Sequence, residues 1–147
     1  MTSDDGAGFA EGSSLKRLSD DGMCFGCGVN NPIGLRLIFD WDGDTYFTRF
    51  TPNKTLQGWA GRVHGGIIAL VLDEVLSRAA LERHGLHWVT AELTTRLVKP
   101  SWVNESLTVT GKVDTVRKSL ITCSGEVSVS DTGVIVAKGF AKLMRAK

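Results

Sequence analysis

The sequence predicts an α+β fold in which one antiparallel sheet of about six strands curves around a single long helix. Residues 67–81 contain no glycine or proline and are rich in leucine and alanine, which is typical of a helix. Apolar side chains lie on most sides of this predicted helix, so other segments must cover it. The residues after it alternate between apolar and polar and are separated by short turns, which favours consecutive antiparallel strands.

The predicted strands follow one another along the chain. Two alternating segments, 35–39 and 46–50, precede the helix and are joined at Asp42-Gly43-Asp44. The helix is expected to end near Arg83, with His84-Gly85 as its stop. After it we expect only strands, over residues 88–98, 107–116, 121–129 and 134–143.

Length, composition and charge predict one domain without a nucleic-acid or membrane partner. The chain has 147 residues, of which 42% are hydrophobic, enough for a substantial core. We expect residues 1–20 to form a flexible tail and residues 21–147 to form the domain. A net charge of +1 gives no basis for binding nucleic acid or a membrane surface. The start lacks the pattern of a secretion signal, and three cysteines do not make a disulfide framework, so we expect a cytoplasmic location.

Asp73 is the polar residue of the predicted helix that fits its surroundings least. Glu74, Arg78 and Glu82 are spaced by four residues and are expected to form a solvated, ion-paired stripe. Asp73 lies about 100° away from that stripe, in line with Ser77 and among leucine and valine side chains. A carboxylate in apolar surroundings suits base or nucleophile work. The alternative is a buried carboxylate that only accepts hydrogen bonds.

His64-Gly65-Gly66 stands before the predicted helix and predicts a place to hold an anion. The first N–H groups of a helix lack partners, and the helix dipole makes this end positive. Glycines let a ligand approach the backbone closely, so a developing oxyanion can be held there. The alternative is an ordinary junction between a loop and a helix.

Cys24 and Cys27 form a CxxC motif, for which we expect no bound metal and no catalytic role. Zinc would need two further ligands, and the sequence has no second CxxC and no HxxxH. A redox-active CxxC belongs at the start of a helix, whereas glycine, asparagine and proline follow this one. The motif is therefore expected to form a turn packed on the core.

Three motifs in consistent order point to a known family. His64-Gly65-Gly66 is followed by an aliphatic run and by an acid, Asp73, at the ninth position after the histidine. Together with residues 90–100, this pattern resembles the hot-dog-fold acyl-CoA thioesterases of the PaaI-like type. Residues 24–35 are similar to the opening of one branch of that family, and the match covers roughly residues 23–145. The resemblance implies a hot-dog fold and hydrolysis of a thioester.

The resemblance also implies roles for individual residues. It makes Gly65 the donor of the oxyanion hole through its backbone N–H, with His64 shaping that loop. It makes Asp73 the nucleophile or the general base, Ser77 a hydroxyl that orients water, and Thr90 the counterpart of a catalytic serine in another branch. The sequence departs from the family at Gly58, where an amide side chain is often found, and the neighbouring Gln57 is the candidate to replace it.

The substrate implied by the resemblance is an acyl-CoA, with coenzyme A entering as part of the substrate and no other cofactor. Gly66 and Trp59 are candidates for contact with the acyl-CoA. Four cations are candidates for the CoA phosphates, the alternative being solvated strand ends: Arg96, Lys99, Arg117 and Lys118.

The spacing of Gly65 and Asp73 predicts a dimer. Eight residues of helix separate them by about 12 Å, whereas an oxyanion donor and a base must both reach the same carbonyl group. A second copy related by a two-fold axis can supply the missing partner, which predicts composite sites. We therefore expect a homodimer or a dimer of dimers.

Two other functions remain open from the sequence. A non-catalytic acyl-CoA-binding module would share the fold but would not need Asp73. A hydratase or dehydratase of the same fold needs a catalytic histidine on the loop before the helix, and residues 57–61 contain none. An acyl group carried on a protein, rather than on CoA, is a further alternative for the thioesterase. A serine hydrolase is disfavoured because no Gly-x-Ser-x-Gly motif occurs.

Overall fold

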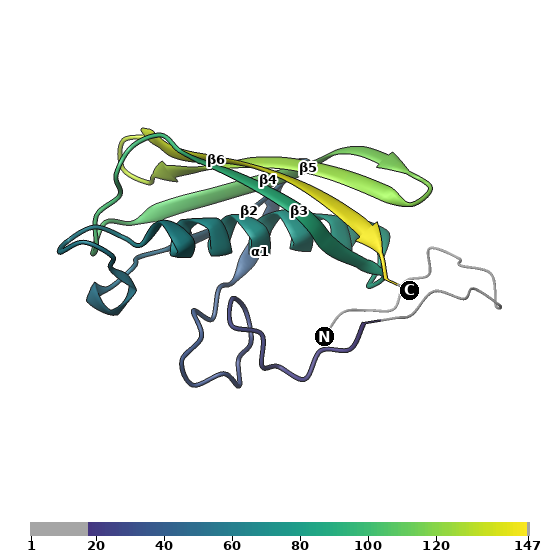
Figure 1. Cartoon of the computed structure of the whole chain (residues 1–147), viewed down its shortest axis with the longest axis horizontal. Helices are drawn as coiled ribbons and strands as arrows, with labels where there is room; N and C mark the ends of the chain where they lie inside the picture. Colours follow the sequence, from purple (N-terminus) through teal and green to yellow (C-terminus); the bar gives the residue numbers. More distant parts are fainter. Residues whose placement is uncertain (1–17, 147) are drawn as a thin grey trace.

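The computed structural model describes residues 18–146 and consists of one sheet with one long helix against it (Figure 1). This arrangement confirms the predicted α+β hot-dog fold. The predicted tail, residues 1–20, lies almost wholly outside the described residues. The elements are β1 (Phe39–Asp42), β2 (Thr45–Phe50), the 3-10 turn η1 (Lys54–Leu56), α1 (Gly65–His84), β3 (Trp88–Leu97), β4 (Leu107–Arg117), β5 (Leu120–Val129) and β6 (Ile135–Arg145).

The six strands form one antiparallel sheet in the order β1-β2-β4-β5-β6-β3. The predicted strands after the helix are confirmed to within two residues at each end. The strand predicted over residues 35–39 overlaps β1 only at Phe39, so the prediction of this strand was wrong for residues 35–38. Arg36 has a positive φ of 52°, which interrupts an extended chain. The crossover α1 places β3 at the edge of the sheet, next to the last strand rather than to β2.

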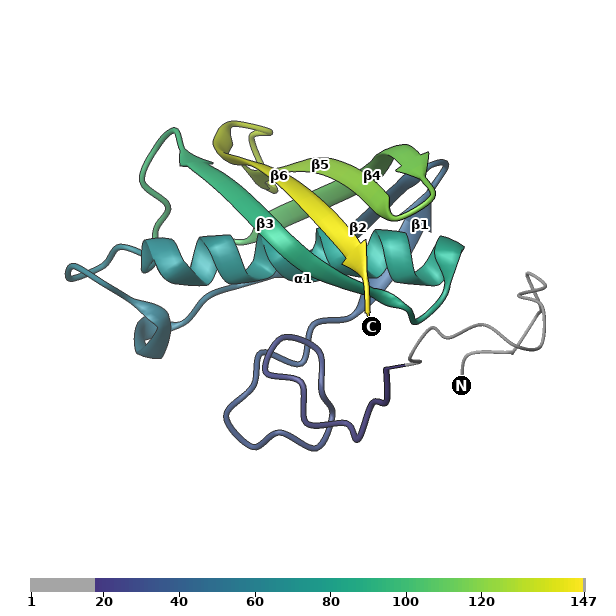
Figure 2. The same ribbon diagram turned by 45° about the vertical axis from the view of Figure 1, so that its right-hand side comes forward.

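The helix α1 spans the whole length of the sheet (Figure 2). It begins at Gly65, two residues before the predicted start, because His64 acts as its N-cap. It ends as predicted: Gly85 has a φ of 87° and donates its N–H to the carbonyl of Leu81 at 2.9 Å. No helix among residues 18–146 is long and apolar enough to cross a membrane.

One face of α1 packs on the concave side of the sheet. A row of glycines, Gly111, Gly125 and Gly139, runs across β4, β5 and β6, each opposite the next. A Cβ at Gly111 would lie 2.9 Å from side-chain atoms of Val75 and Leu76. The row therefore lets the helix approach the sheet closely. The helix residues buried on this face are Ile68, Val71, Leu72, Val75, Leu76, Ala79 and Ala80.

The other face of α1 is covered in part by the segment before β1, drawn in purple and blue below the helix in Figure 1. The chain therefore does cover the helix on more than one side, as predicted. This cover corrects one expectation, that Glu74 and Arg78 belong to a solvated stripe. Cys24 donates to Glu74 at 3.1 Å, and Arg78 donates to the sulfur of Cys27 at 2.8 Å. Of the predicted stripe, Glu82 alone is exposed, and Glu74 and Arg78 are half-buried.

Candidate active site

The start of α1 carries an N–H group without an acceptor. His64 accepts a hydrogen bond from the backbone N–H of Gly66 through Nδ1, at 2.8 Å. The N–H of Ile67 donates to the carbonyl of His64 at 2.9 Å. Within residues 18–146 the N–H of Gly65 has no such acceptor. The capping histidine thus satisfies one donor and leaves its neighbour free, at the positive end of the helix dipole.

The two glycines at this helix start lie close to neighbouring side chains. A Cβ at Gly65 would lie 2.8 Å from Cδ1 of Leu97, and a Cβ at Gly66 would lie 3.0 Å from Nδ1 of His64. Residue 66 must therefore be small for the histidine to cap the helix. Gly66 is exposed, so it can also be reached by a ligand.

A surface hollow of about 510 Å³ opens beside the free N–H. Trp59 is 84% exposed at its rim, where a ligand can reach the indole. Gln57 lies nearby, but its Oε1 accepts from the N–H of Gly61 at 3.0 Å, so this oxygen holds the loop. The lining residues are Gly58, Trp59, Arg62, Val63, His64, Gly65 and Pro100.

Sequence reasoning missed Arg62 as a residue of this hollow. Its guanidinium lies 5.2 Å from the centre of the Trp102 ring, and both side chains are exposed. Such a stacked cation is held in place while its N–H groups stay available to an anion. The only signal in the sequence is its place two residues before His64.

Asp73 lies in the middle of α1, and its Oδ1 is buried without a hydrogen-bond partner among the described residues. Buried carboxylate oxygens are nearly always paired, so an unpaired one in a folded chain indicates a missing partner. As predicted, Asp73 and Gly65 share one helix, about 12 Å apart along its axis. One chain therefore does not bring them to the same point.

Ser77 and Thr90 differ in their surroundings. The hydroxyl of Ser77 donates to the carbonyl of Glu74 at 3.3 Å, so it is bonded within its own helix. Its oxygen still has lone pairs with which to accept. Thr90 lies on β3 opposite Leu143, where the register shifts before Glu92, and it is half-buried. The structure does not link either residue to Asp73 by a hydrogen bond among residues 18–146.

The four cations proposed for the CoA phosphates fall into two groups. Arg96 lies in β3 and Lys99 just after it, at the end of the sheet next to the start of α1. Arg117 ends β4 and Lys118 follows it in the turn to β5. The register aligns them, across β5 and β6, with Val89 at the opposite end of β3. The eight-residue separation of Val89 and Leu97 spans about 26 Å of strand. A single chain therefore presents one pair of these cations to the hollow.

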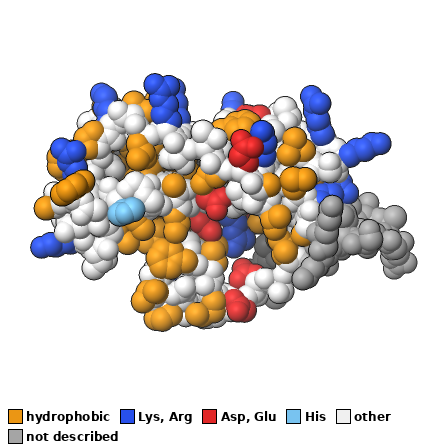
Figure 3. All heavy atoms as spheres, viewed as in Figure 1, with side chains coloured by type: hydrophobic (Ala, Val, Ile, Leu, Met, Phe, Trp, Pro, Cys, Tyr) orange, Lys and Arg blue, Asp and Glu red, His pale blue; other side chains and the backbone are white. Residues whose placement is uncertain are grey.

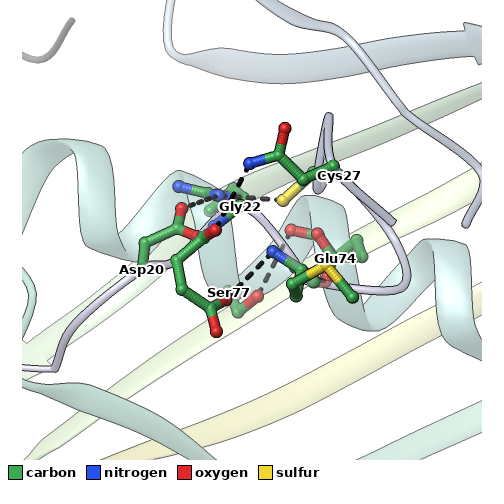
Figure 4. A network of polar contacts seen from close by, with 10 residues as sticks. Asp20, Gly22, Cys27, Glu74 and Ser77 are labelled. Carbon is green, nitrogen blue, oxygen red and sulfur yellow. Dashed lines mark hydrogen bonds and ion pairs between the residues drawn. The ribbon is translucent and has the colours of Figure 1, made fainter. Parts of the chain in front are cut away.

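The CxxC turn lies against α1 at Glu74, the residue that follows Asp73. Figure 4 shows the network that joins it to the helix through Cys27, Glu74 and residues around them. Arg78 also reaches Asp20 at 3.6 Å. Burial raises the pKa of the Cys27 thiol to about 12, although the hydrogen bond from Arg78 opposes this rise. The motif is thus a turn, as the sequence predicted, but its cysteines pack on Glu74 and Arg78 of α1 rather than on the apolar core.

The sequence model of one family matches residues 60–136, slightly more than half of the chain, and its description is the thioesterase superfamily. The chain belongs to the thioesterase superfamily. The match includes the helix start, Asp73 and the edge strand β3, and it supports a thioesterase-type function. A comparison with curated protein sequences gives no match.

Solved structures of thioesterase superfamily proteins have the same fold. One such protein is 29% identical, with a TM-score of 0.77, over 84% of this chain and 60% of its own. The present chain thus spans 60% of that protein's length. The PaaI protein of the E. coli phenylacetic acid degradation operon is 21% identical, with a TM-score of 0.66, over 74% of this chain and 81% of that protein. A hypothetical thioesterase from Streptococcus pneumoniae TIGR4, solved with coenzyme A, is 16% identical, with a TM-score of 0.67, over 75% of this chain and 85% of that protein.

Proposed function

We propose that this thioesterase superfamily protein hydrolyses acyl-CoA thioesters to a free acid and the CoA thiol. One observation carries the proposal: α1 holds both an unpaired N–H at Gly65 and an unpaired, buried carboxylate oxygen at Asp73. A thioester carbonyl needs a donor for the oxygen that becomes negative and a base or nucleophile at the carbon. The Gly65 N–H is a donor of the first kind, and the Asp73 carboxylate can act as the base or the nucleophile.

The chemistry needs only these two groups and water. The Gly65 N–H donates to the thioester oxygen and stabilises the charge that develops there. As a general base, Asp73 takes a proton from water, the water oxygen bonds to the carbonyl carbon, the C–S bond breaks, and the thiolate takes the proton. As a nucleophile, Asp73 displaces the thiolate itself and forms an anhydride that water then hydrolyses.

The proposal includes a dimer, because the two groups lie about 12 Å apart in one chain. In a two-fold dimer, Gly65 of one protomer meets Asp73 of its partner, and two equivalent sites result. The open edge of β3 gives such a dimer a surface on which to form. Val89 and Leu97 on β3 and Val98 just after it are exposed apolar side chains, and hydrophobic side chains are visible on the face drawn in Figure 3.

Coenzyme A is the proposed thiol carrier, supported by the pneumococcal neighbour solved with coenzyme A. Arg62, Arg96 and Lys99 are the proposed contacts for its phosphates at the hollow, and Trp59 is exposed for the adenine or the acyl group. All three cysteines are unpaired, in keeping with the reducing cytoplasm as the proposed location.

A hydrolysis screen tests the activity and its carboxylate. Short, long, branched and aromatic acyl-CoAs are incubated with the chain, and the free thiol is followed. With the best substrate, Asp73→Asn is expected to remove nearly all turnover, because the amide cannot act as a base, while binding of the substrate persists. Glu82→Gln, on the same helix and exposed, serves as the control and is expected to keep wild-type kcat. A wild-type chain that binds acyl-CoA but hydrolyses none is the non-catalytic module instead.

A second pair of variants tests the oxyanion donor. Gly65 is the first residue of α1, where proline is tolerated, and His64 has a ψ of 132°, which is compatible with a following proline. Gly65→Pro deletes the N–H and is expected to lower kcat by about a hundredfold to a thousandfold. Gly65→Ala brings the same Cβ against Leu97 but keeps the N–H, so it is the matched control. Equal kcat for the two variants would remove Gly65 from the mechanism.

A further inference from the structure

The CxxC turn and α1 bring three metal-ligating side chains together. One ligand atom each from Cys24, Cys27 and Glu74 lies within 4.8 Å of the other two. The ligand atoms of a tetrahedral zinc site lie about 3.6 to 3.8 Å apart, as bond lengths of about 2.3 Å to sulfur and 2.0–2.2 Å to oxygen require. Closing the observed triangle onto an ion therefore takes side-chain shifts of roughly 1 Å. The sequence argued against zinc for want of further ligands, and the fold supplies Glu74.

The turn is held in place by its own backbone and not only by the thiols. The N–H of Gly28 donates to the carbonyl of Cys24 at 2.8 Å, and the N–H of Leu37 donates to the carbonyl of Gly26 at 2.9 Å. A Cβ at Gly26 would lie 2.2 Å from Cγ of Glu74, so only glycine permits this approach. The backbone thus presents both sulfurs to the glutamate in advance.

With zinc bound, the charges of the cluster nearly balance. Two thiolates and a carboxylate carry one negative charge more than Zn²⁺ neutralises. The Arg78 guanidinium, 2.8 Å from the sulfur of Cys27 and 3.6 Å from Asp20, adds positive charge beside the cluster and an N–H donor to that sulfur. Thiolate ligands select zinc over magnesium or calcium.

We propose that Cys24, Cys27 and Glu74 form a zinc site with three protein ligands that fastens the segment before β1 to the middle of α1. Zinc displaces the protons of the two thiols and bonds to both sulfurs and to one oxygen of Glu74. No fourth protein ligand lies in the cluster among residues 18–146, so water completes the tetrahedron. The ion is not part of the proposed reaction; it fixes the helix at the residue that follows Asp73.

Metal content and cobalt spectra test the site directly. The full, untagged chain is reduced, washed with chelator, dialysed against zinc chloride and then metal-free buffer, and analysed for zinc per chain. We expect one zinc per chain for the wild type. With Co²⁺ in its place, we expect a near-ultraviolet thiolate-to-cobalt band and the strong visible bands of a tetrahedral site. Both readouts are independent of thioesterase activity.

Variants then assign the ligands. Cys24→Ser and Cys27→Ser are each expected to lose stoichiometric zinc and most of the thiolate-to-cobalt band, and Glu74→Gln to weaken zinc binding by at least about tenfold. Glu82→Gln lies two turns further along the same helix and Cys123 is buried in the core, so Glu82→Gln and Cys123→Ser are expected to keep the ion. Circular dichroism checks that each variant is folded.

Two results would overturn the proposal. One is a folded, reduced wild-type chain that takes up no zinc and gives no thiolate-to-cobalt band. The other is zinc at wild-type stoichiometry in both cysteine variants, which would place the ion elsewhere. A chain isolated with a Cys24–Cys27 disulfide that still takes up no zinc after that disulfide is reduced would also overturn the proposal.

Discussion

At the scale of single residues, Ser77 and Thr90 are the proposed hydroxyls for orienting the attacking water. Ser77 lies one helical turn beyond Asp73, and its hydroxyl already donates to the carbonyl of Glu74. If either residue orients water, losing the hydroxyl weakens an interaction that matters most in the transition state. We therefore expect Ser77→Ala and Thr90→Ala to lower kcat by about tenfold to a hundredfold, or ~1.4 to 2.7 kcal/mol, with KM nearly unchanged.

Steady-state kinetics of both single variants and the double variant measure this effect. If the Ser77 hydroxyl only donates to the carbonyl of Glu74, Ser77→Ala will leave kcat unchanged. A double variant with wild-type kcat would show that Asp73 or the backbone holds the water without either hydroxyl.

Single residues also show why part of the site escaped prediction. Asp73 and Gly65 could be found because helix periodicity places a carboxylate among apolar neighbours and glycines at a helix start. The contacts of Glu74 and Arg78 could not, because they depend on residues about fifty positions away in a segment without periodicity. Arg62 was missed for the same reason, since its stacking on Trp102 joins two loops.

At the scale of elements, the helix and the sheet are fitted to each other through the glycine row of Gly111, Gly125 and Gly139. Gly111→Ala places a methyl group 2.9 Å from side-chain atoms of both Val75 and Leu76. These neighbours are fully buried and have little room to move, so we expect a loss of about 1–3 kcal/mol of unfolding free energy. Lys112→Ala, the next residue and exposed on the opposite face, is the control. Urea unfolding of both variants measures the difference, and equal midpoints would show that the helix can shift without cost.

The elements were predicted well because their signal is periodic and local. Four strands after the helix and the helix itself have the expected places, differing by two residues or fewer at their ends. The strand predicted over residues 35–39 was misplaced, because Leu35 and Leu37 alternate without pairing in the sheet. Leu37 is buried, and its N–H donates to the carbonyl of Gly26 in the CxxC turn. The alternation of Leu35 and Leu37 therefore reflects burial of a loop and not a strand.

At the scale of the whole molecule, the site is expected to be complete only in a dimer. Mixing two inactive variants tests this. Asp73→Asn and Gly65→Pro each damage both sites of their own homodimer, but a mixed dimer has one site with both groups intact. Random exchange makes half of the dimers mixed, each with one working site of two, so about a quarter of wild-type activity should return.

Sedimentation of the wild type is expected to show a dimer or a dimer of dimers in the same buffer. A stable monomer with full activity would contradict the composite site. So would a failure of the mixture to regain activity after subunit exchange has been shown independently.

The glycine row has a further consequence for how the molecule opens. It separates two clusters of buried side chains, one around Leu72, Val109 and Val127 and the other around Leu76, Ile121 and Leu143. Across the row the sheet has no side chains to join them, so α1 is the element that links the two clusters. The last turns of α1, packed with Trp88 and the ends of β5 and β6, can then open in a step separate from the half that holds Gly65 and Asp73. Amide hydrogen exchange would register two opening units of different free energy, with their boundary within α1 between Val75 and Leu76.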